Sequence, residues 1–260
     1  MRTNTTLVIN PKGGSGKTTV AINLASYFAS NNVATTLMDY DPQGSGLNWL
    51  RLRAPHAARI HGANGAPPKA GHLRSIDMHV PPETQQLIID APAGASGLLL
   101  QELLTRAHCI LVPVAPSAID IHATANFIRD LLIAGRIRAN HIRLAVVAIR
   151  VRKSMPVYQP LERFLNSLNL PLLARLGDSD VYVNAAETGI GIFEMDFATS
   201  AAERQQFLPI AEWVDSRQLI IGERVQPALP SSRPAPILAP ARPGLRVIGN
   251  GTSSHPGVRQ

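Results

Sequence analysis

Five short apolar runs, separated by stretches with helical spacing, constrain the fold of this 260-residue chain most strongly. Almost every residue in each run is apolar, which is typical of strands buried on both faces of a sheet. Strands that alternate with helices form parallel sheets with right-handed crossovers. We therefore expect an α/β fold with a single, doubly wound, mostly parallel sheet flanked by helices. The predicted strands are residues 6–10, 33–40, 86–92, 108–114 and 142–149, and the predicted helices are residues 18–29, 97–106, 119–134, 157–167 and 201–217.

A glycine-rich segment, NPKGGSGKTT at residues 10–19, joins the first predicted strand to the first predicted helix. Glycines let backbone N–H groups crowd around phosphate oxygens, and the N-terminus of the following helix adds the positive end of its dipole. In such a loop, Lys17 reaches the β- and γ-phosphates of a nucleotide, and the Thr18 hydroxyl ligates Mg²⁺. The segment therefore predicts a nucleotide site of the P-loop NTPase type. Its candidate ligands are Lys12, Gly13, Gly14, Ser15, Gly16, Lys17, Thr18 and Thr19.

Carboxylates follow two further predicted strands, at the edge of the sheet where the glycine-rich loop should lie. Asp39 and Asp41 come at the end of the second strand, and Asp90 ends the third. Parallel sheets bind ligands at the carboxyl ends of their strands, and Mg²⁺ prefers oxygen ligands. We therefore expect these three side chains to complete a Mg²⁺ and phosphate site. Each of them, taken alone, could instead be a helix N-cap.

Three segments resemble motifs of the ParA/MinD family of ATPases. The standard phosphate loop has glycine at the position of Pro11, whereas KGGSGKTT begins with a second lysine, Lys12, and resembles the family's deviant Walker A box. DYDPQGS at residues 39–45 resembles the family's DxDPQGS segment, and LIIDAP at residues 87–92 resembles its Walker B box. The resemblance covers roughly residues 3–217. Weaker similarities are Trp49 with Arg51 and Arg53, and a late segment at residues 184–194.

The resemblance implies an ATPase that uses ATP and Mg²⁺. In this family the early lysine, here Lys12, contacts the nucleotide of a partner subunit, so that ATP favours a homodimer. The family pattern also implies that Asp41 orients or activates the attacking water, that Asp39 supports the region of Lys17 and Mg²⁺, and that Asp90 holds Mg²⁺ through water. The implied catalytic residues are Lys12, Lys17 and Asp41, and the implied metal-site residues are Thr18, Asp39 and Asp90.

The family suggests three kinds of function. ParA-like members bind duplex DNA non-specifically in the ATP state, and a cargo-bound partner protein stimulates hydrolysis. Their cargoes are plasmids, chromosome regions or protein assemblies such as carboxysomes and chemoreceptor clusters. MinD-like members bind membranes through a C-terminal amphipathic helix, and biosynthetic ligases on the same scaffold spend ATP on a small molecule. We expect the first kind, because the C-terminus is proline-rich and because such ligases usually lack a lysine at the position of Lys12.

The distribution of charge favours nucleic acid as a partner. The net charge is +7, and residues 129–153 contain seven basic residues against one acid, Asp130. Phosphate contacts without base readout give non-specific DNA binding. The alternative is a set of solvated arginines, and Asp178 and Asp180 stand where many ParA-like chains carry arginine. The candidate DNA-binding residues are Arg150, Arg152, Lys153 and Arg175.

Composition predicts where the domain ends. Residues 225–260 hold seven prolines, four arginines and no acidic residue, so we expect an ATPase domain at 1–222 and a disordered tail at 223–260. Residues 51–74 hold five basic residues, three histidines and no acid, and we expect them to form a long surface loop. A metal site at His56, His61 and His72 is the less favoured reading of this loop, because their spacing is loose.

Other compositional features exclude several classes of protein. The single cysteine, Cys109, excludes a disulfide framework and a four-cysteine zinc site within one chain. No apolar run reaches 18 residues, and the first residues do not resemble a signal peptide. We therefore expect a protein without a transmembrane segment that acts in the cytoplasm, in association with the nucleoid.

Overall fold

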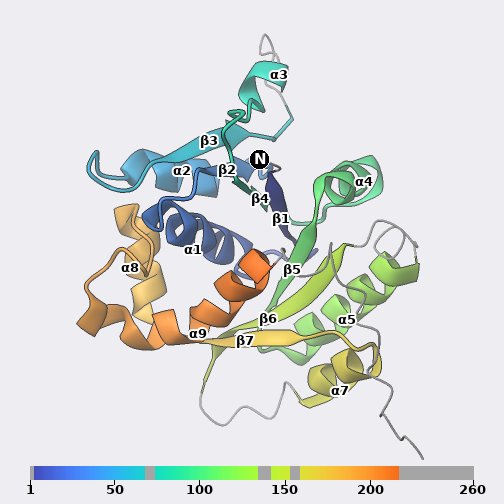
Figure 1. Cartoon of the computed structure of the whole chain (residues 1–260). Helices are drawn as coiled ribbons and strands as arrows, with labels where there is room; N and C mark the ends of the chain where they lie inside the picture. Colours follow the sequence, from blue (N-terminus) through green and yellow to red (C-terminus); the bar gives the residue numbers. More distant parts are fainter. Residues whose placement is uncertain (1–2, 68–73, 134–141, 153–158, 217–260) are drawn as a thin grey trace, which may run out of the picture. The chain divides into compact units, whose positions relative to one another are not determined.

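Seven parallel strands form one sheet in the computed structural model of this chain (Figure 1). The structure describes residues 3–67, 74–133, 142–152 and 159–216, all within the first of two units, Met1–Ile221 and Gly222–Gln260, into which the chain divides. The strands are β1 (Asn4–Val8), β2 (Thr35–Asp39), β3 (Ile60–Asn64), β4 (Gln86–Asp90), β5 (Cys109–Val114), β6 (Arg143–Val151) and β7 (Leu172–Gly177), in the spatial order β3-β2-β4-β1-β5-β6-β7. The helices of the described residues are α1 (Lys17–Ser30), α2 (Ser45–Leu52), α3 (Arg74–Asp77), α4 (Gly97–Arg106), α5 (Ala118–Ile133), α7 (Gln159–Ser167), α8 (Asp180–Thr188) and α9 (Phe197–Asp215).

This architecture confirms the predicted doubly wound parallel sheet. The five predicted strands correspond to β1, β2, β4, β5 and β6. Helices cover both faces: α1 and α9 pack on one face, and α4, α5 and α7 pack on the other. The crossover from β1 to β2 thus runs on the opposite face from the crossover between β4 and β5, as a doubly wound sheet requires.

The two edge strands were not predicted from the sequence. The expectation of a surface loop at 51–74 is wrong where α2 extends to Leu52 and where β3 pairs with β2. β3 is only partly buried. A strand with exposed positions needs no continuous apolar run, and the sequence of β3, IHGAN, contains none. β7, at the other edge, also mixes exposed and buried positions. Continuous apolar runs mark strands that are covered on both faces, and they miss edge strands such as these.

The two faces of the sheet carry separate hydrophobic clusters. Leu7 of β1 belongs to one cluster, together with Leu103 of α4. Its neighbour Val8 belongs to the other cluster, together with Leu24 of α1 and Phe207 of α9. Successive side chains of a strand point to opposite faces, so burial of both faces requires apolar residues at consecutive positions.

The register of the sheet brings the carboxyl ends of three strands together. Asp39, the last residue of β2, pairs with Asp90, the last residue of β4. Asp90 also pairs with Val8, the last residue of β1. The chain that leaves β1 therefore begins beside Asp90, with Asp39 one strand further away, at the edge where parallel sheets bind their ligands.

The C-terminal predictions concern residues that are not described. The expected tail at 223–260 and its boundary after residue 222 lie outside the described residues. Within the described part of the chain, no helix combines the length and the apolar character that a membrane span needs.

The connection between α8 and α9 packs closely on α1. Gly191 in this connection lies against Ser26 of α1, which is fully buried. A Cβ atom added at Gly191 would lie 2.5 Å from the Cβ of Ser26, closer than real side chains approach one another. The position therefore requires glycine for reasons of space.

We expect Gly191→Ala to lower the free energy of unfolding by about 1–3 kcal/mol, the usual cost of overpacking a core. Denaturant unfolding followed by circular dichroism would measure it. Gly177→Ala is the matched control, because the nearest atom to its added Cβ is 3.5 Å away, an ordinary contact. Equal stability of the two variants would contradict the prediction.

Candidate nucleotide-binding site

The glycine-rich loop connects β1 to α1 at the carboxyl edge of the sheet. Gly14 and Gly16 have φ angles of 71° and 77°, in the left-handed region that glycine adopts without strain. Gly16 is the N-cap of α1, and no side chain caps the helix there. The first N–H groups of α1 are therefore available to bind an anion, which the positive end of the helix dipole also favours.

Asn10 anchors this loop, and sequence reasoning did not single it out. Its side-chain oxygen accepts a hydrogen bond from the N–H of Lys12 at 2.9 Å. Its amide nitrogen donates to the carbonyl of Pro113 at 2.7 Å and to the hydroxyl of Thr124 at 3.0 Å. Asn10 is buried, and it ties the start of the loop to β5 and α5. A polar residue that ends an apolar strand was the signal available in the sequence.

The two lysines of the loop have different surroundings. Lys17 is buried, and its Nζ donates to the carbonyl of Lys12 at 3.0 Å. Burial lowers the pKa of Lys17, while the nearby carboxylates of Asp90 and Asp41 oppose this effect. The Lys12 side chain is 43% exposed, and its Nζ lies 4.0 Å from a carboxylate oxygen of Asp120 in α5. Lys17 therefore faces the inside of the site, and Lys12 lies at its surface.

Asp90 and Thr18 form the part of the site suited to a metal ion. The hydroxyl of Thr18 donates to Oδ2 of Asp90 at 2.6 Å. Asp90 is buried, and its Oδ1 has no hydrogen-bond partner among the described residues. Burial raises the pKa of Asp90 to about 7, against the lowering effects of Thr18 and Lys17. A buried carboxylate oxygen without a partner, next to a hydroxyl, fits the oxygen ligands that Mg²⁺ takes beside a phosphate.

Asp39 serves the neighbouring helix. Its Oδ1 accepts a hydrogen bond from the N–H of Asp41 at 2.9 Å, and its Oδ2 accepts from Gly46 at 2.8 Å and Leu47 at 3.2 Å. Burial raises the pKa of Asp39, and these three hydrogen bonds oppose the rise. Both of its oxygens are thus engaged at the N-terminus of α2. Asp39 is not the N-cap residue of α2, which is Gly44, but its carboxylate accepts from the first N–H groups of that helix; a role in holding Mg²⁺ stays a prediction.

Asp41, two residues after Asp39, is only partly buried. Its Oδ1 accepts a hydrogen bond from the N–H of Gln43 at 2.9 Å, which holds the turn before α2. Its charge raises the pKa of Lys17, so the two groups share one electrostatic environment. The structure thereby brings the loop of Asp39 and Asp41 together with the glycine-rich loop.

A cavity of about 320 Å³ adjoins the glycine-rich loop, and no sequence motif pointed to it. Gly16 and Thr19 line one side, and Arg150 and Tyr182 belong to the walls that β6 and α8 contribute. Arg150 has φ 51°, a left-handed conformation unusual outside glycine, where the register of β6 and β7 shifts. The remaining lining residues are Ile149, Leu176, Gly177, Asp178, Ser179, Val183, Ala186 and Glu187.

The candidate DNA-binding residues do not share one environment. Arg152 donates to a carboxylate oxygen of Asp178 at 2.8 and 3.0 Å. Arg175 is paired with Glu162 of α7. Arg150 lines the cavity, and Lys153 lies outside the described residues. Two of the four basic side chains are thus engaged by acids of the same chain.

Of the three histidines of residues 51–74, His56 and His61 lie within the described residues. His61 contacts the carbonyl oxygen of His79 at 3.1 Å through its Nε2, and His72 lies outside the described residues. Among residues whose placement is described, no three His, Cys, Asp or Glu side chains come together as they would around a metal.

Comparison with known proteins identifies a matching family and similar sequences. The family model described as "CobQ/CobB/MinD/ParA nucleotide binding domain" matches residues 6–192. "Maintenance of carboxysome distribution protein A" of Halothiobacillus neapolitanus is 24% identical over 196 residues, which are 74% of this chain and 87% of that protein. "Chromosome-partitioning ATPase Soj" of Thermus thermophilus is 35% identical over 114 residues, which are 43% of this chain and only 45% of that protein.

Solved structures share the fold at lower sequence identity. An ATP complex of McdA from Cyanothece superposes with a TM-score of 0.61 at 15% identity, covering 82% of this chain and 96% of that one. MinD from Pyrococcus horikoshii OT3, in complex with Mg-ADP, also has a TM-score of 0.61 at 18% identity, covering 84% and 98%. These likenesses confirm the fold class expected from the sequence.

The raised pKa of Asp90 makes a prediction about stability in the absence of metal. Between an unfolded pKa near 3.8 and a folded pKa of about 7, the folded chain holds the proton more tightly than the unfolded chain. The contribution of Asp90 to stability should therefore fall as the pH rises through this window and stay constant above it. Asp90→Asn has no such titration.

We expect the difference in unfolding free energy, wild type minus Asp90→Asn, to fall by a few kcal/mol between about pH 4 and pH 7, since a tenfold change in proton affinity corresponds to about 1.4 kcal/mol. Urea unfolding of both proteins with a chelator present would measure this difference. A difference that does not vary with pH would show that Asp90 titrates normally in the folded chain.

Proposed function

Because the chain belongs to the CobQ/CobB/MinD/ParA family of nucleotide-binding domains, we propose that it is a ParA-like ATPase that positions or partitions a cargo. One observation carries the proposal: the buried Lys17 of the glycine-rich loop shares its environment with Asp90 and Asp41. A buried cation, a carboxylate suited to Mg²⁺ and a less buried carboxylate are the groups that hydrolysis of a triphosphate requires.

The proposed ATP complex uses both the loop and the cavity. Residues 13–19 would hold the phosphates through backbone N–H groups and Lys17. The cavity beside Gly16 would take the nucleoside, since it has the size of a small-molecule site and the apolar side chains of Ile149 and Leu176 in its walls. Thr18 and Asp90 would hold Mg²⁺, the latter through water. Bound Mg²⁺ would supply positive charge that stabilises the phosphate oxygens during transfer.

Hydrolysis would proceed by in-line attack of water on the γ-phosphorus. Asp41 would orient this water, and the bond from the γ-phosphorus to its bridging oxygen would break to release ADP and phosphate. Lys17 and Lys12 would stabilise the charge that develops on the phosphate oxygens. Asp39 would act on this step by holding the backbone of Asp41.

Features of the surface support a homodimer around ATP. Lys12 is nearly half exposed, and its distance of 4.0 Å from Asp120 is at the limit for an ion pair, so it can reach a second copy. Leu98 and Ile119 are 84% and 72% exposed at the starts of α4 and α5. The loop before α4 is bonded to the glycine-rich loop, because the N–H of Gly94 donates to the carbonyl of Pro11. The second copy would cover these apolar side chains and receive Lys12 at its phosphates.

The relatives suggest what the ATPase serves. They are named for carboxysome distribution and for chromosome partitioning. We infer by analogy that the ATP-bound dimer binds duplex DNA non-specifically on the nucleoid, and that a cargo-bound partner protein stimulates hydrolysis. Arg150, Arg152, Lys153 and Arg175 remain the candidate DNA contacts.

Variants of the loop lysines and of Asp41 separate the proposed steps. Lys17→Ala should weaken binding of Mg-ATP at least about tenfold, because it removes a charge-assisted hydrogen bond to phosphate. Lys12→Ala should bind nucleotide as a monomer, whereas Asp41→Ala should bind it and stay dimeric, because the water is not oriented. Titration with a fluorescent ATP analogue and sedimentation velocity would measure binding and dimerisation.

Lys69→Ala, which alters a lysine outside every predicted site, is the control and should behave like the wild type. A wild-type chain that stays monomeric at saturation with a non-hydrolysable ATP analogue would refute the dimer. A Lys12→Ala variant that dimerises like the wild type would refute the role of that lysine.

Binding to arbitrary duplex DNA should require ATP or its analogue and weaken with salt. With nucleotide at saturation for each variant, because Arg150 also lines the cavity, Arg150→Ala should lower the slope of log affinity against log salt by about one for each subunit, as loss of one phosphate contact does. Arg175→Ala should have a smaller effect, because Glu162 engages its guanidinium. Fluorescence anisotropy at several salt concentrations would measure these slopes.

Arg106→Ala removes the same charge from α4, outside the basic cluster, and should leave the slope unchanged. If the ATP-bound wild type ignored DNA at low salt and bound anionic vesicles, the MinD-like alternative would replace this proposal.

A further inference from the structure

We propose that Arg53 and Glu194 are positioning residues that hold the Asp39–Asp41 loop in a fixed place relative to the cavity. The two residues are 141 positions apart in the sequence. Neither touches the glycine-rich loop, and both act through the helices that they join. The proposal deepens the function proposed above and rests on it for its catalytic consequence alone.

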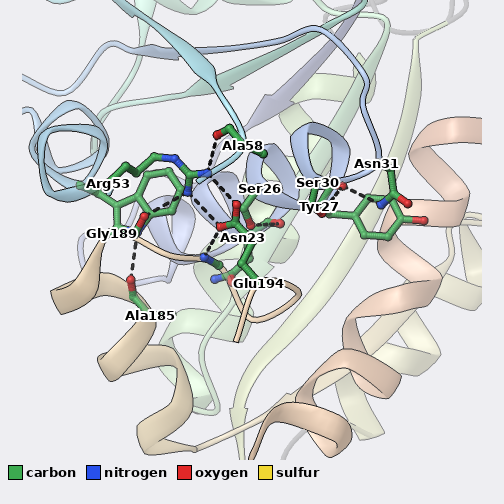
Figure 2. A network of polar contacts seen from close by, with 12 residues as sticks. Asn23, Ser26, Tyr27, Ser30, Asn31, Arg53, Ala58, Ala185, Gly189 and Glu194 are labelled. Atoms are coloured by element: carbon green, nitrogen blue, oxygen red, sulfur yellow. Dashed lines mark hydrogen bonds and ion pairs between the residues drawn. The ribbon is translucent and has the colours of Figure 1, made fainter. Parts of the chain in front are cut away.

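Arg53 and Glu194 form a largely buried, two-pronged ion pair (Figure 2). The two terminal nitrogens of Arg53 donate to the two carboxylate oxygens of Glu194, at 2.9 and 2.6 Å. The same nitrogens donate to the carbonyls of Gly189, at 3.0 Å, and Ala58, at 2.6 Å. The side chains of Arg53 and Glu194 are only 7% and 11% exposed. All four hydrogens of these nitrogens therefore have acceptors.

The pair lies where α2 meets α8. Arg53 is the residue that ends α2, and its guanidinium lies 4.9 Å from the centre of the Trp49 ring. Trp49 donates from its indole nitrogen to the carbonyl of Ala185 in α8, at 2.9 Å. Gly189 ends α8 so close to α2 that an added Cβ would lie 2.5 Å from the carbonyl carbon of Leu52. The two helices thus approach each other with their backbones in contact.

The same junction also engages the helix of the glycine-rich loop. Glu194 accepts a hydrogen bond from the N–H of Gly191 at 2.8 Å, which shapes the turn after α8. Ile192 in this turn donates its N–H to the side chain of Asn23 in α1, at 2.9 Å. Asn23 in turn donates to the carbonyl of Thr19, a residue that lines the cavity. Figure 2 shows Asn23, Arg53 and Glu194, from three segments that are distant in the sequence, gathered at this junction.

Away from this junction, α2 and α8 each lead to part of the candidate site. The N-terminus of α2 is held by Asp39 and follows the turn that contains Asp41. The opposite element, α8, contributes Tyr182 and Ala186 to the cavity wall. A displacement of α2 against α8 would therefore move Asp41 relative to a nucleotide bound in the cavity.

A buried ion pair adds little to the net free energy of unfolding, because the cost of desolvating two charges offsets much of their attraction. Its planar, two-pronged geometry instead fixes the relative position of the groups that it joins. This geometry is what a site assembled from α1, α2 and α8 needs. A lysine at position 53 would keep the positive charge but would lose the planar guanidinium group that donates two parallel hydrogen bonds.

Hydrogen exchange tests the positioning role without any nucleotide. The N–H groups of Gly46 and Leu47 donate to Asp39 about 10 Å along α2 from Arg53, at 1.5 Å per residue. In Arg53→Lys, we expect these two amides to exchange at least about tenfold faster, because α2 as a whole loses its fixed place. Glu194→Gln, a milder change that keeps the size of the side chain, should show the same effect if Arg53→Lys does not fold.

Arg143→Lys is the matched control. Arg143 lies 4.4 Å from the centre of the Trp213 ring and donates to the carbonyls of Trp213 and Val214, so its contacts resemble those of Arg53 at another place in the fold. This variant should leave Gly46 and Leu47 unchanged. If Arg53→Lys accelerated exchange only near the pair, as at Gly191, the positioning role would be overturned.

Steady-state kinetics test the catalytic consequence. Arg53→Lys should lower kcat for ATP hydrolysis about tenfold with less than a threefold change in KM, because misplacement of Asp41 affects the reacting phosphate more than the bound nucleoside. An unchanged kcat in a variant with accelerated exchange would overturn that consequence. If the wild type hydrolysed no ATP, the proposed function would fail, and the exchange experiment would still decide the role of the pair.

Discussion

The register between β4 and its neighbours β2 and β1 is the constraint on which the candidate site depends. It aligns the ends of three adjacent strands at one edge, so that Asp90 lies between Asp39 and the start of the glycine-rich loop. A shift of one residue would turn each buried side chain to the opposite face. The two apolar clusters prevent such a shift, because each face of the sheet is already matched to the helices that cover it.

Burial of charge then gives the site its chemistry. Asp39, Asp90 and Lys17 are all buried, which is costly unless each charge finds partners. Asp39 is satisfied by backbone N–H groups and Lys17 by a carbonyl, with carboxylates nearby. Asp90 keeps one oxygen without a partner among the described residues, and burial raises its pKa to about 7. Asp90 is therefore the carboxylate suited to a cation, whereas Asp39 holds the backbone at the start of α2.

Much of the fold and part of the site could be predicted from local patterns. The apolar runs located β1, β2, β4, β5 and β6, and the glycines between a strand and a helix located the loop. β3 and β7 were missed because edge strands lack the same continuity. The cavity was missed because its walls come from three separate regions, around Gly16, Arg150 and Tyr182, and no spacing in the sequence relates them.

The sequence by itself determined the strand–loop–helix unit at 6–29 and the placing of aspartates at strand ends, because both depend on residues that are close along the chain. The tertiary structure alone decided that Asp39 accepts from the first N–H groups of α2, that Asp90 keeps an oxygen without a partner among the described residues, and that Arg53 meets Glu194. The physical reason is that hydrogen bonding and desolvation depend on which groups surround a side chain in space. In a parallel sheet with crossovers, those groups come from distant parts of the chain.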